Sequence, residues 1–261
     1  MNPLKTHFDQ LLVQGYELKI QQYLSRAWQI FKKEPAFFIG FMFVNVFISL
    51  LASVIPVLGN FLSIIFAPVL AIAPAIVAQK IDKGQPYVFN NFFDGFQKFV
   101  PLLLAYLIMV GIIIVLALVC IGVPLALSDN LQDLATINPQ NLEEMQVLLN
   151  NKSLILGAGV FMVGAVFVSV LYFFAPYFVW FHDFSATDAL KASQLLAQKN
   201  FWGIVLFFLT TFLLNFLGLL ALCIGILITA PVSYIAQYCL FEDVVGTQFK
   251  NDLNDTPQDL E

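Results

Sequence analysis

Few residues of this chain are of the types that carry out chemistry, and their spacing fits no catalytic or metal-binding pattern. The two histidines, His7 and His182, show neither HExxH nor any comparable ligand spacing. Chemistry inside a membrane would require a nucleophile with a base, or a metal with its ligands. The sequence provides neither at membrane depth, so we predict that the chain is not an enzyme and holds no cofactor or metal.

The three cysteines do not change this prediction. Cys120, Cys223 and Cys239 all lie in or beside apolar runs, and their spacing matches no metal motif. We interpret them as small apolar side chains that fill space between helices.

Five residues are the candidates for lining a cavity. Asn45 and Asn215 are the only strongly polar residues, apart from hydroxyls, deep within the apolar runs. We expect their amides to bond to a neighbouring helix or to a backbone carbonyl, and to face any polar lumen. Pro68, Pro176 and Pro231 each free a carbonyl about one turn earlier and can kink a helix. Kinked helices could line a cavity, but proline is common in spanning helices in any case.

A stripe of small residues follows one of the apolar runs. Its members recur every fourth position and are Gly59, Ser63, Ala67, Ala71 and Ala75. In lipid, small side chains let helix backbones approach closely. The stripe therefore predicts a helix-packing face; the alternative is a substrate groove.

The composition shows what surrounds these residues. Of 261 residues, 60% are hydrophobic and 11% are charged, and the mean hydropathy is +0.85. Soluble domains carry about 25% charged residues. The sequence therefore predicts an all-α membrane protein, and no cleavable signal peptide is expected before its first apolar run.

Six apolar runs are long enough to cross about 30 Å of hydrocarbon. We place the predicted transmembrane helices at residues 36–55, 59–79, 99–127, 154–181, 201–222 and 224–241. Short turns separate the first two and the last two, so these pairs are predicted to be helical hairpins. A re-entrant pair that does not cross fully is the alternative.

The basic residues predict the orientation in the membrane. Of the 12 lysines and arginines, all but Lys152 lie in the two terminal segments or in the segments between runs two and three and between runs four and five. Because basic residues stay on the cytoplasmic side, we predict cytoplasmic termini in a bacterial inner membrane. The domains are a cytoplasmic segment with an amphipathic helix (1–35), a transmembrane domain (36–243) with an acidic outer loop (128–153), and an acidic tail (244–261).

The runs also form a weak internal repeat. Phe66–Pro68, Phe174–Pro176 and Thr229–Pro231 each fall in the second helix of a pair. An amphipathic segment precedes each pair, at residues 16–31, 89–99 and 189–196. Ser185 and Asp188 form a capping box that would start the last of these segments. We therefore predict three helical hairpins in a parallel three-fold repeat, each preceded by an interfacial helix.

Several landmarks of glycine, proline and aromatic residues resemble a known family. They are Ala27–Pro35, Ile55–Gly59, Phe66–Pro68, Phe93–Phe96 and the segment from Phe174 to Asn200. Together they resemble an uncharacterised family of bacterial polytopic inner-membrane proteins. They also resemble, more distantly, the membrane domain attached to some glycerophosphodiester phosphodiesterases. The resemblance implies a fold but no reaction, and we do not expect the phosphodiesterase activity to apply to these residues.

Two hypotheses of function follow. The first is a non-enzymatic scaffold, assembly or modulatory protein of the cell envelope, with membrane lipids and an envelope protein as partners. The alternative is a carrier or lipid-handling protein whose cavity is lined by the proline-kinked helices. Nucleic acid is not a predicted partner.

Overall fold

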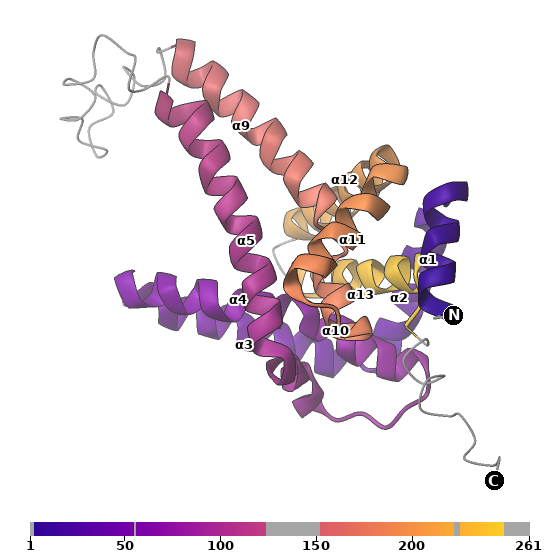
Figure 1. The fold of residues 1–261 in the computed structure, drawn as a ribbon. Coiled ribbons are helices and arrows are strands. Elements are labelled where there is room, and N and C mark those ends of the chain that lie inside the picture. The colour runs from indigo at the N-terminus through magenta and orange to yellow at the C-terminus, as the bar shows by residue number, and fades with distance from the viewer. Residues whose placement is uncertain (1–2, 55, 124–151, 222–224, 248–261) are drawn as a thin grey trace. The chain divides into compact units, whose positions relative to one another are not determined.

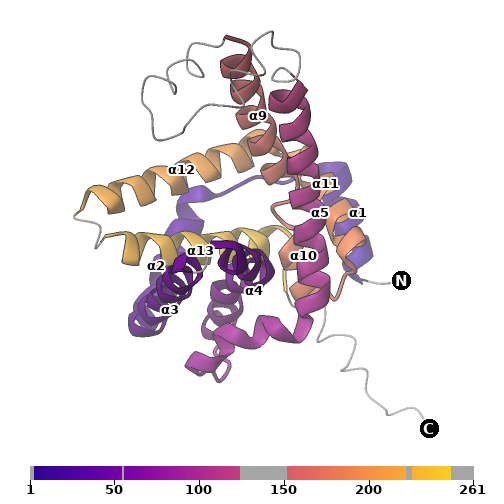
Figure 2. The same cartoon turned by 90° about the vertical axis from the view of Figure 1, so that its left-hand side faces the viewer.

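The structure is a computed structural model that describes residues 3–54, 56–123, 152–221 and 225–247. These residues are almost all helical, and no β-strand occurs among them. They divide into two compact units, and the ribbon of the chain is drawn in two views in Figure 1 and Figure 2. Unit 1 consists of Met1–Ala105 and Phe173–Glu261, and unit 2 of Tyr106–Tyr172.

The helices of unit 1 begin with α1 (Pro3–Gln14), α2 (Ile20–Lys33), α3 (Pro35–Val54) and α4 (Pro56–Asp82). The 3₁₀ helix η1 (Phe89–Lys98) leads into α5 (Phe99–Ala117), which continues into unit 2. Unit 1 resumes with α10 (Ala175–His182), α11 (Ala186–Lys199), α12 (Phe201–Leu220) and α13 (Ile226–Val244). In unit 2, α5 is followed by the short π-helix η2 (Leu118–Gly122), which packs against α9 (Lys152–Leu171).

Five helical segments are long and apolar enough to cross a membrane. They are Pro35–Val54, Phe61–Asp82, Phe89–Gly122, Lys152–His182 and Phe201–Leu220, found among the residues that the structure describes. Each overlaps one of the first five predicted runs. The chain is thus an integral membrane protein with several apolar helices, as its composition predicts.

The sixth predicted run, 224–241, forms a helix but is not among those five. It corresponds to α13, which packs against α2, α12, α4 and α3. Ten of its residues are buried, including Ile235, Ala236 and Tyr238. Gln237, Glu242 and Asp243 lower its hydropathy, and a helix enclosed by other helices can carry such polar residues where they find partners. The prediction of about six spanning helices thus exceeds the five described here.

The fourth predicted run, 154–181, is not one continuous helix. α9 ends at Leu171, a turn covers Tyr172–Phe174, and α10 starts at Ala175. Pro176 lies in the first turn of α10, where the missing N–H of proline costs no hydrogen bond. Pro176 therefore begins a helix, whereas Pro68 and Pro231 lie inside α4 and α13.

The three predicted amphipathic segments correspond to α2, η1 and α11. Their caps differ in detail from the predictions. Ser185 accepts a hydrogen bond from the backbone N–H of Asp188 at 3.2 Å, as a helix N-cap should. Its hydroxyl also donates to the Asp188 carboxylate at 2.7 Å, instead of the reciprocal bond of a full capping box. The phenylalanine-rich segment is 3₁₀ and not α-helical, and Gly95 lets it lie directly on Val69 and Ile72 of α4.

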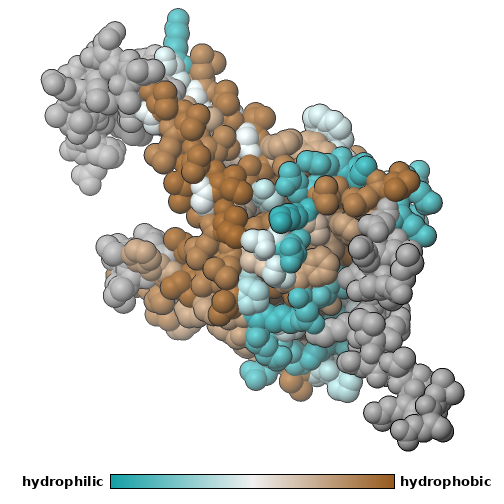
Figure 3. Space-filling view, in the orientation of Figure 1, coloured by the Kyte–Doolittle hydropathy of each residue, from teal (hydrophilic) through white to brown (hydrophobic). Residues whose placement is uncertain are grey.

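Hydrophobic side chains cover α5 and α9, and also parts of α3 and α4 (Figure 3). Exposed residues there include Phe47, Leu50 and Val54 on α3 and Phe61 on α4. Hydrophilic side chains gather instead around α10 and α11 of unit 1 (Figure 3). Apolar surface of this extent on helix ends is typical of contact with lipid.

Candidate functional site

Ion pairs join the polar ends of the unit 1 helices. Lys83 of α4 pairs with Glu242 of α13 at 3.1 Å, and Lys80 of α4 pairs with Asp94 of η1 at 3.1 Å. Other pairs are Arg26–Asp82, Lys19–Asp243 and Lys98–Asp183. Each joins segments that the sequence assigns to the same side of the membrane. Five basic residues of this unit are thus paired with acids, and most of these acids lie far away in sequence.

Asp82 of α4 bonds to side chains of two other helices. It accepts hydrogen bonds from Nε and Nη2 of Arg26 and, at 3.0 Å, from the hydroxyl of Tyr238. Burial opposes the charge of Arg26, but the hydrogen bonds and charge of Asp82 outweigh it and raise the pKa of the guanidinium. Asp82 therefore ties α2, α4 and α13 together.

Tyr23 of α2 makes a similar tie to α13. The side chain is buried, and its hydroxyl donates to Asp243 Oδ2 at 2.7 Å. Burial, and then the contact with the Asp243 carboxylate, raise the pKa of Tyr23 above its ordinary value of 10.0. Its neutral form is therefore favoured in the folded protein.

Alkaline pH is expected to weaken the folded state through Tyr23. Because its folded pKa exceeds the unfolded one, its contribution is fully present below pH 10.0. Above that pH the contribution falls by about 1.4 kcal/mol per pH unit for one such group, until the folded pKa is reached. Tyr23→Phe should flatten the alkaline limb of a thermal-unfolding profile recorded in detergent from pH 8 to pH 11. An unchanged limb would contradict the assignment.

Asn215 lies between α12 and α13. Its Nδ2 donates to Thr211 O and to Ser233 Oγ, both at 2.8 Å. The hydroxyl of Ser233 in turn donates to Thr229 O. The amide thus bonds both to its own helix and to a neighbouring one. Asn215 Oδ1 and Thr229 Oγ1 are buried without a hydrogen-bond partner. This polar cluster holds α12 on α13.

Asn45 lies instead in a groove between α3 and α4. Its Nδ2 donates to Phe41 O of the same helix at 3.0 Å, and Ser49 Oγ donates to Asn45 O. The groove has a volume of about 400 Å³. The residues lining it are Phe41, Met42, Asn45, Ile48 and Ser49 of α3, Ser63, Phe66, Ala67, Leu70, Ala71 and Pro74 of α4, and Tyr234 of α13.

The small-residue stripe of α4 lies partly in helix packing and partly at the groove. Gly59 packs on the backbone of Ala52 in α3, and Ala75 is buried. Between them, Ser63, Ala67 and Ala71 border the groove. The packing interpretation thus fits the ends of the stripe, and the groove interpretation fits its middle.

The three prolines predicted to border a cavity are not among the residues that line this groove. Pro68 and Pro231 are buried, and Pro176 is half-buried at the start of α10. The proline in the groove lining is Pro74, one turn and a half beyond Pro68. Pro74 also lies in the second predicted run, and its i+3 spacing from the small residue Ala71 is the signal that could have placed it at the groove.

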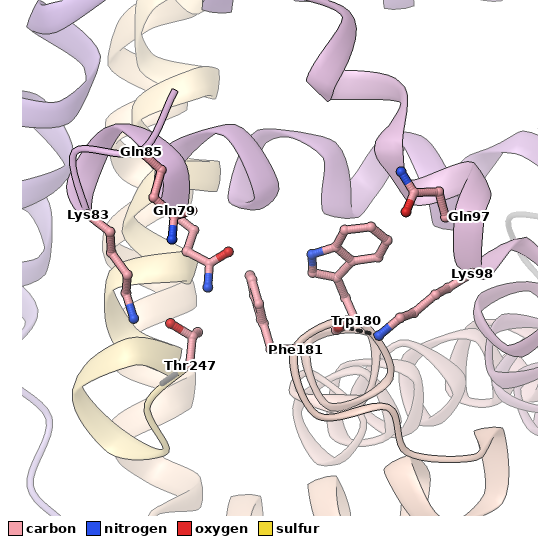
Figure 4. Close-up of a pocket in the computed structure, with 8 residues that line it drawn as sticks. All are labelled: Gln79, Lys83, Gln85, Gln97, Lys98, Trp180, Phe181 and Thr247. Atoms are coloured by element: carbon pink, nitrogen blue, oxygen red, sulfur yellow. Dashed lines mark hydrogen bonds between the residues drawn. The ribbon is translucent and has the colours of Figure 1, made fainter. Parts of the chain in front are cut away.

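A second, polar pocket lies at the other end of α4 (Figure 4). Its volume is about 240 Å³, and its lining is Gln79, Lys83, Gln85, Gln97, Lys98, Trp180, Phe181 and Thr247. None of the residues predicted from the sequence to form a site lies in this pocket. No local pattern could have revealed it, because its walls come from four separate segments of the chain.

The structure locates some of the histidines and cysteines considered in the sequence. His182 donates from Nε2 to Gly246 O at 2.9 Å, and Cys239 is buried in α13. Cys120 is half-buried in η2, and Cys223 lies outside the described residues. So do residues 128–151 of the acidic loop and the tail after Thr247. Within the described ranges, no cluster of three or more His, Cys, Asp or Glu residues could hold a metal ion.

Comparison with known protein families, with curated proteins and with solved structures finds no match to this chain.

Proposed function

We propose that this chain is a non-enzymatic multi-pass protein of the bacterial inner membrane that binds membrane lipid in the groove between α3 and α4. The proposal includes cytoplasmic termini, three helical hairpins with α13 as the last helix, and membership of the inner-membrane family that its landmarks resemble. The contacts of α3 with α4, of α12 with α13 and of η2 with α9 support the hairpins. Five ion pairs between segments assigned to the same side of the membrane support the orientation.

The proposed function is based on the groove between α3 and α4. Asn45 is near the centre of α3, a helix of 20 residues, which spans about 30 Å. If α3 crosses the membrane, the groove opens at mid-depth, where lipid tails are the surrounding solvent. Its walls are mostly apolar, with Asn45, Ser49 and Ser63 as polar exceptions. Such a surface fits a lipid tail that carries a polar group part of the way along.

The test is to fill the groove. Ala71→Phe and Ala67→Phe place a ring in its middle, and Ala36→Phe is the matched control on an exposed alanine of α3. Overfilling costs a few kcal/mol, so we expect lipid to bind about tenfold more weakly to the groove variants. Lipid that co-purifies with the protein in mild detergent would be extracted and measured by mass spectrometry.

Equal lipid content in all three variants would contradict lipid binding in the groove. The scaffold hypothesis would then take its place. Pull-down of an envelope protein by both the wild type and the groove-filled variants would support that hypothesis.

A further inference from the structure

We propose that the polar pocket at the end of α4 binds a phosphate group. Its lining combines the ammonium of Lys83, the amides of Gln79 and Gln85, and the hydroxyl of Thr247 (Figure 4). All of these can donate hydrogen bonds, and no Asp or Glu is among the described residues that form its walls. The volume of about 240 Å³ is several times the ~30 Å³ that a water molecule takes up in the liquid.

Thr247 gives independent support for a ligand. The residue is only 6% exposed, and its Oγ1 is buried without a hydrogen-bond partner. In Figure 4 this hydroxyl points toward the side of the pocket where Lys83 lies. A buried hydroxyl that stays unpaired destabilises the fold, and a phosphate oxygen in the pocket would accept its hydrogen bond.

The two lysines of the pocket have different roles. Lys98 donates to Val179 O at 3.2 Å and to Trp180 O at 2.6 Å, pairs with Asp183 and lies over the Trp180 ring. These contacts occupy its donors, so it contributes charge and holds the wall in place. Lys83 pairs with one carboxylate oxygen of Glu242. An ammonium has three N–H donors, so Lys83 can bind a phosphate oxygen while it keeps Glu242.

The location is compatible with two sources of phosphate. Gln79 ends the predicted second run, so in the proposed orientation the pocket lies at the cytoplasmic headgroup level, where basic residues meet anionic lipid. Free phosphate could also enter from solvent. The pocket shares no lining residue with the groove between α3 and α4. Its occupation can therefore be tested separately, and failure of one site would not imply failure of the other.

The experiment measures thermal unfolding of the full chain in two settings. One is a titration with sodium phosphate in detergent against sodium chloride at the same ionic strength. The other compares nanodiscs of phosphatidylglycerol with nanodiscs of a neutral glycolipid that has no phosphate. The test variants are Thr247→Val and the charge-balanced pair Lys83→Gln with Glu242→Gln, which leaves no unpaired carboxylate. The controls are Thr247→Ser, which keeps the hydroxyl, and Lys33→Gln, which removes an exposed lysine of α2.

We expect phosphate, phosphatidylglycerol or both to stabilise the wild type, with the phosphate effect saturable. Loss of a hydrogen bond to a charged ligand should weaken the apparent affinity about tenfold in Thr247→Val and in the double variant. Thr247→Ser and Lys33→Gln should retain it. Stabilisation by phosphatidylglycerol alone would assign the site to a lipid headgroup, and stabilisation by free phosphate would assign it to a soluble anion. The proposal is overturned if neither stabilises the wild type, or if both test variants respond as the wild type does.

Discussion

Replacing Gly59 by valine is expected to lower the free energy of unfolding by about 3 kcal/mol, near the upper end of the usual cost of overpacking. A Cβ atom at this position would lie 2.8 Å from Cα of Ala52 and nearer still to its carbonyl group. These are backbone atoms, so no side-chain rotation can relieve the clash. α3 and α4 would have to separate at this point of contact.

Gly111→Val is the matched control for this variant. Gly111 also lies in a spanning helix, α5, but nothing approaches within 4 Å of a Cβ built there. Unfolding in detergent should therefore show a large loss of stability for Gly59→Val and a small one for Gly111→Val. Similar losses for both would mean that close approach of α3 and α4 at Gly59 does not limit stability.

Replacing Asp82 by alanine is expected to cost about 2–4 kcal/mol, because it breaks a partly buried charge pair and leaves the donors of Arg26 and Tyr238 without their acceptor. The Asp82 side chain is 15% exposed, whereas that of Arg26 is 41% exposed. The exposure of Arg26 allows water to replace part of the lost attraction, which keeps the estimate below that for a fully buried pair. Tyr238 is fully buried, so its hydroxyl has no such replacement.

A double-mutant cycle separates the pair from its surroundings. Arg26→Gln and Asp82→Asn each leave one charge without its partner, whereas the double variant removes both. We expect the double variant to lose less stability than the two single variants combined, by about 1 kcal/mol or more. Strict additivity in chemical unfolding would show that Arg26 and Asp82 do not interact.

Much of the helical content was predictable because it depends on local composition. Runs of about 20 apolar residues can satisfy their backbone only as helices when lipid surrounds them. The predicted runs 36–55, 59–79 and 201–222 accordingly match α3, α4 and α12 to within a few residues. The Ser185 cap and the helical spacing of α2 and α11 were equally local.

The candidate site was only partly predictable. Asn45 and the middle of the small-residue stripe could be selected from their residue types and spacing. Their meeting across one groove, with Tyr234 of α13 as a third wall, could not. Pro176 carried the same motif as Pro68 and Pro231 but begins a helix after a break. A proline motif alone does not distinguish a kink from a first turn.

The sequence by itself determined that this chain consists of apolar helices with its basic residues gathered in particular segments. The reason is that hydropathy and helix length act within about 20 residues of chain. The tertiary structure alone decided that α13 is enclosed by other helices, and which acids pair with Lys19, Arg26, Lys80, Lys83 and Lys98. Tyr23 and Asp243 are 220 residues apart, and Arg26 and Asp82 are 56 apart. Contacts over such separations depend on how the helices pack, because no local pattern specifies which side chains will oppose one another.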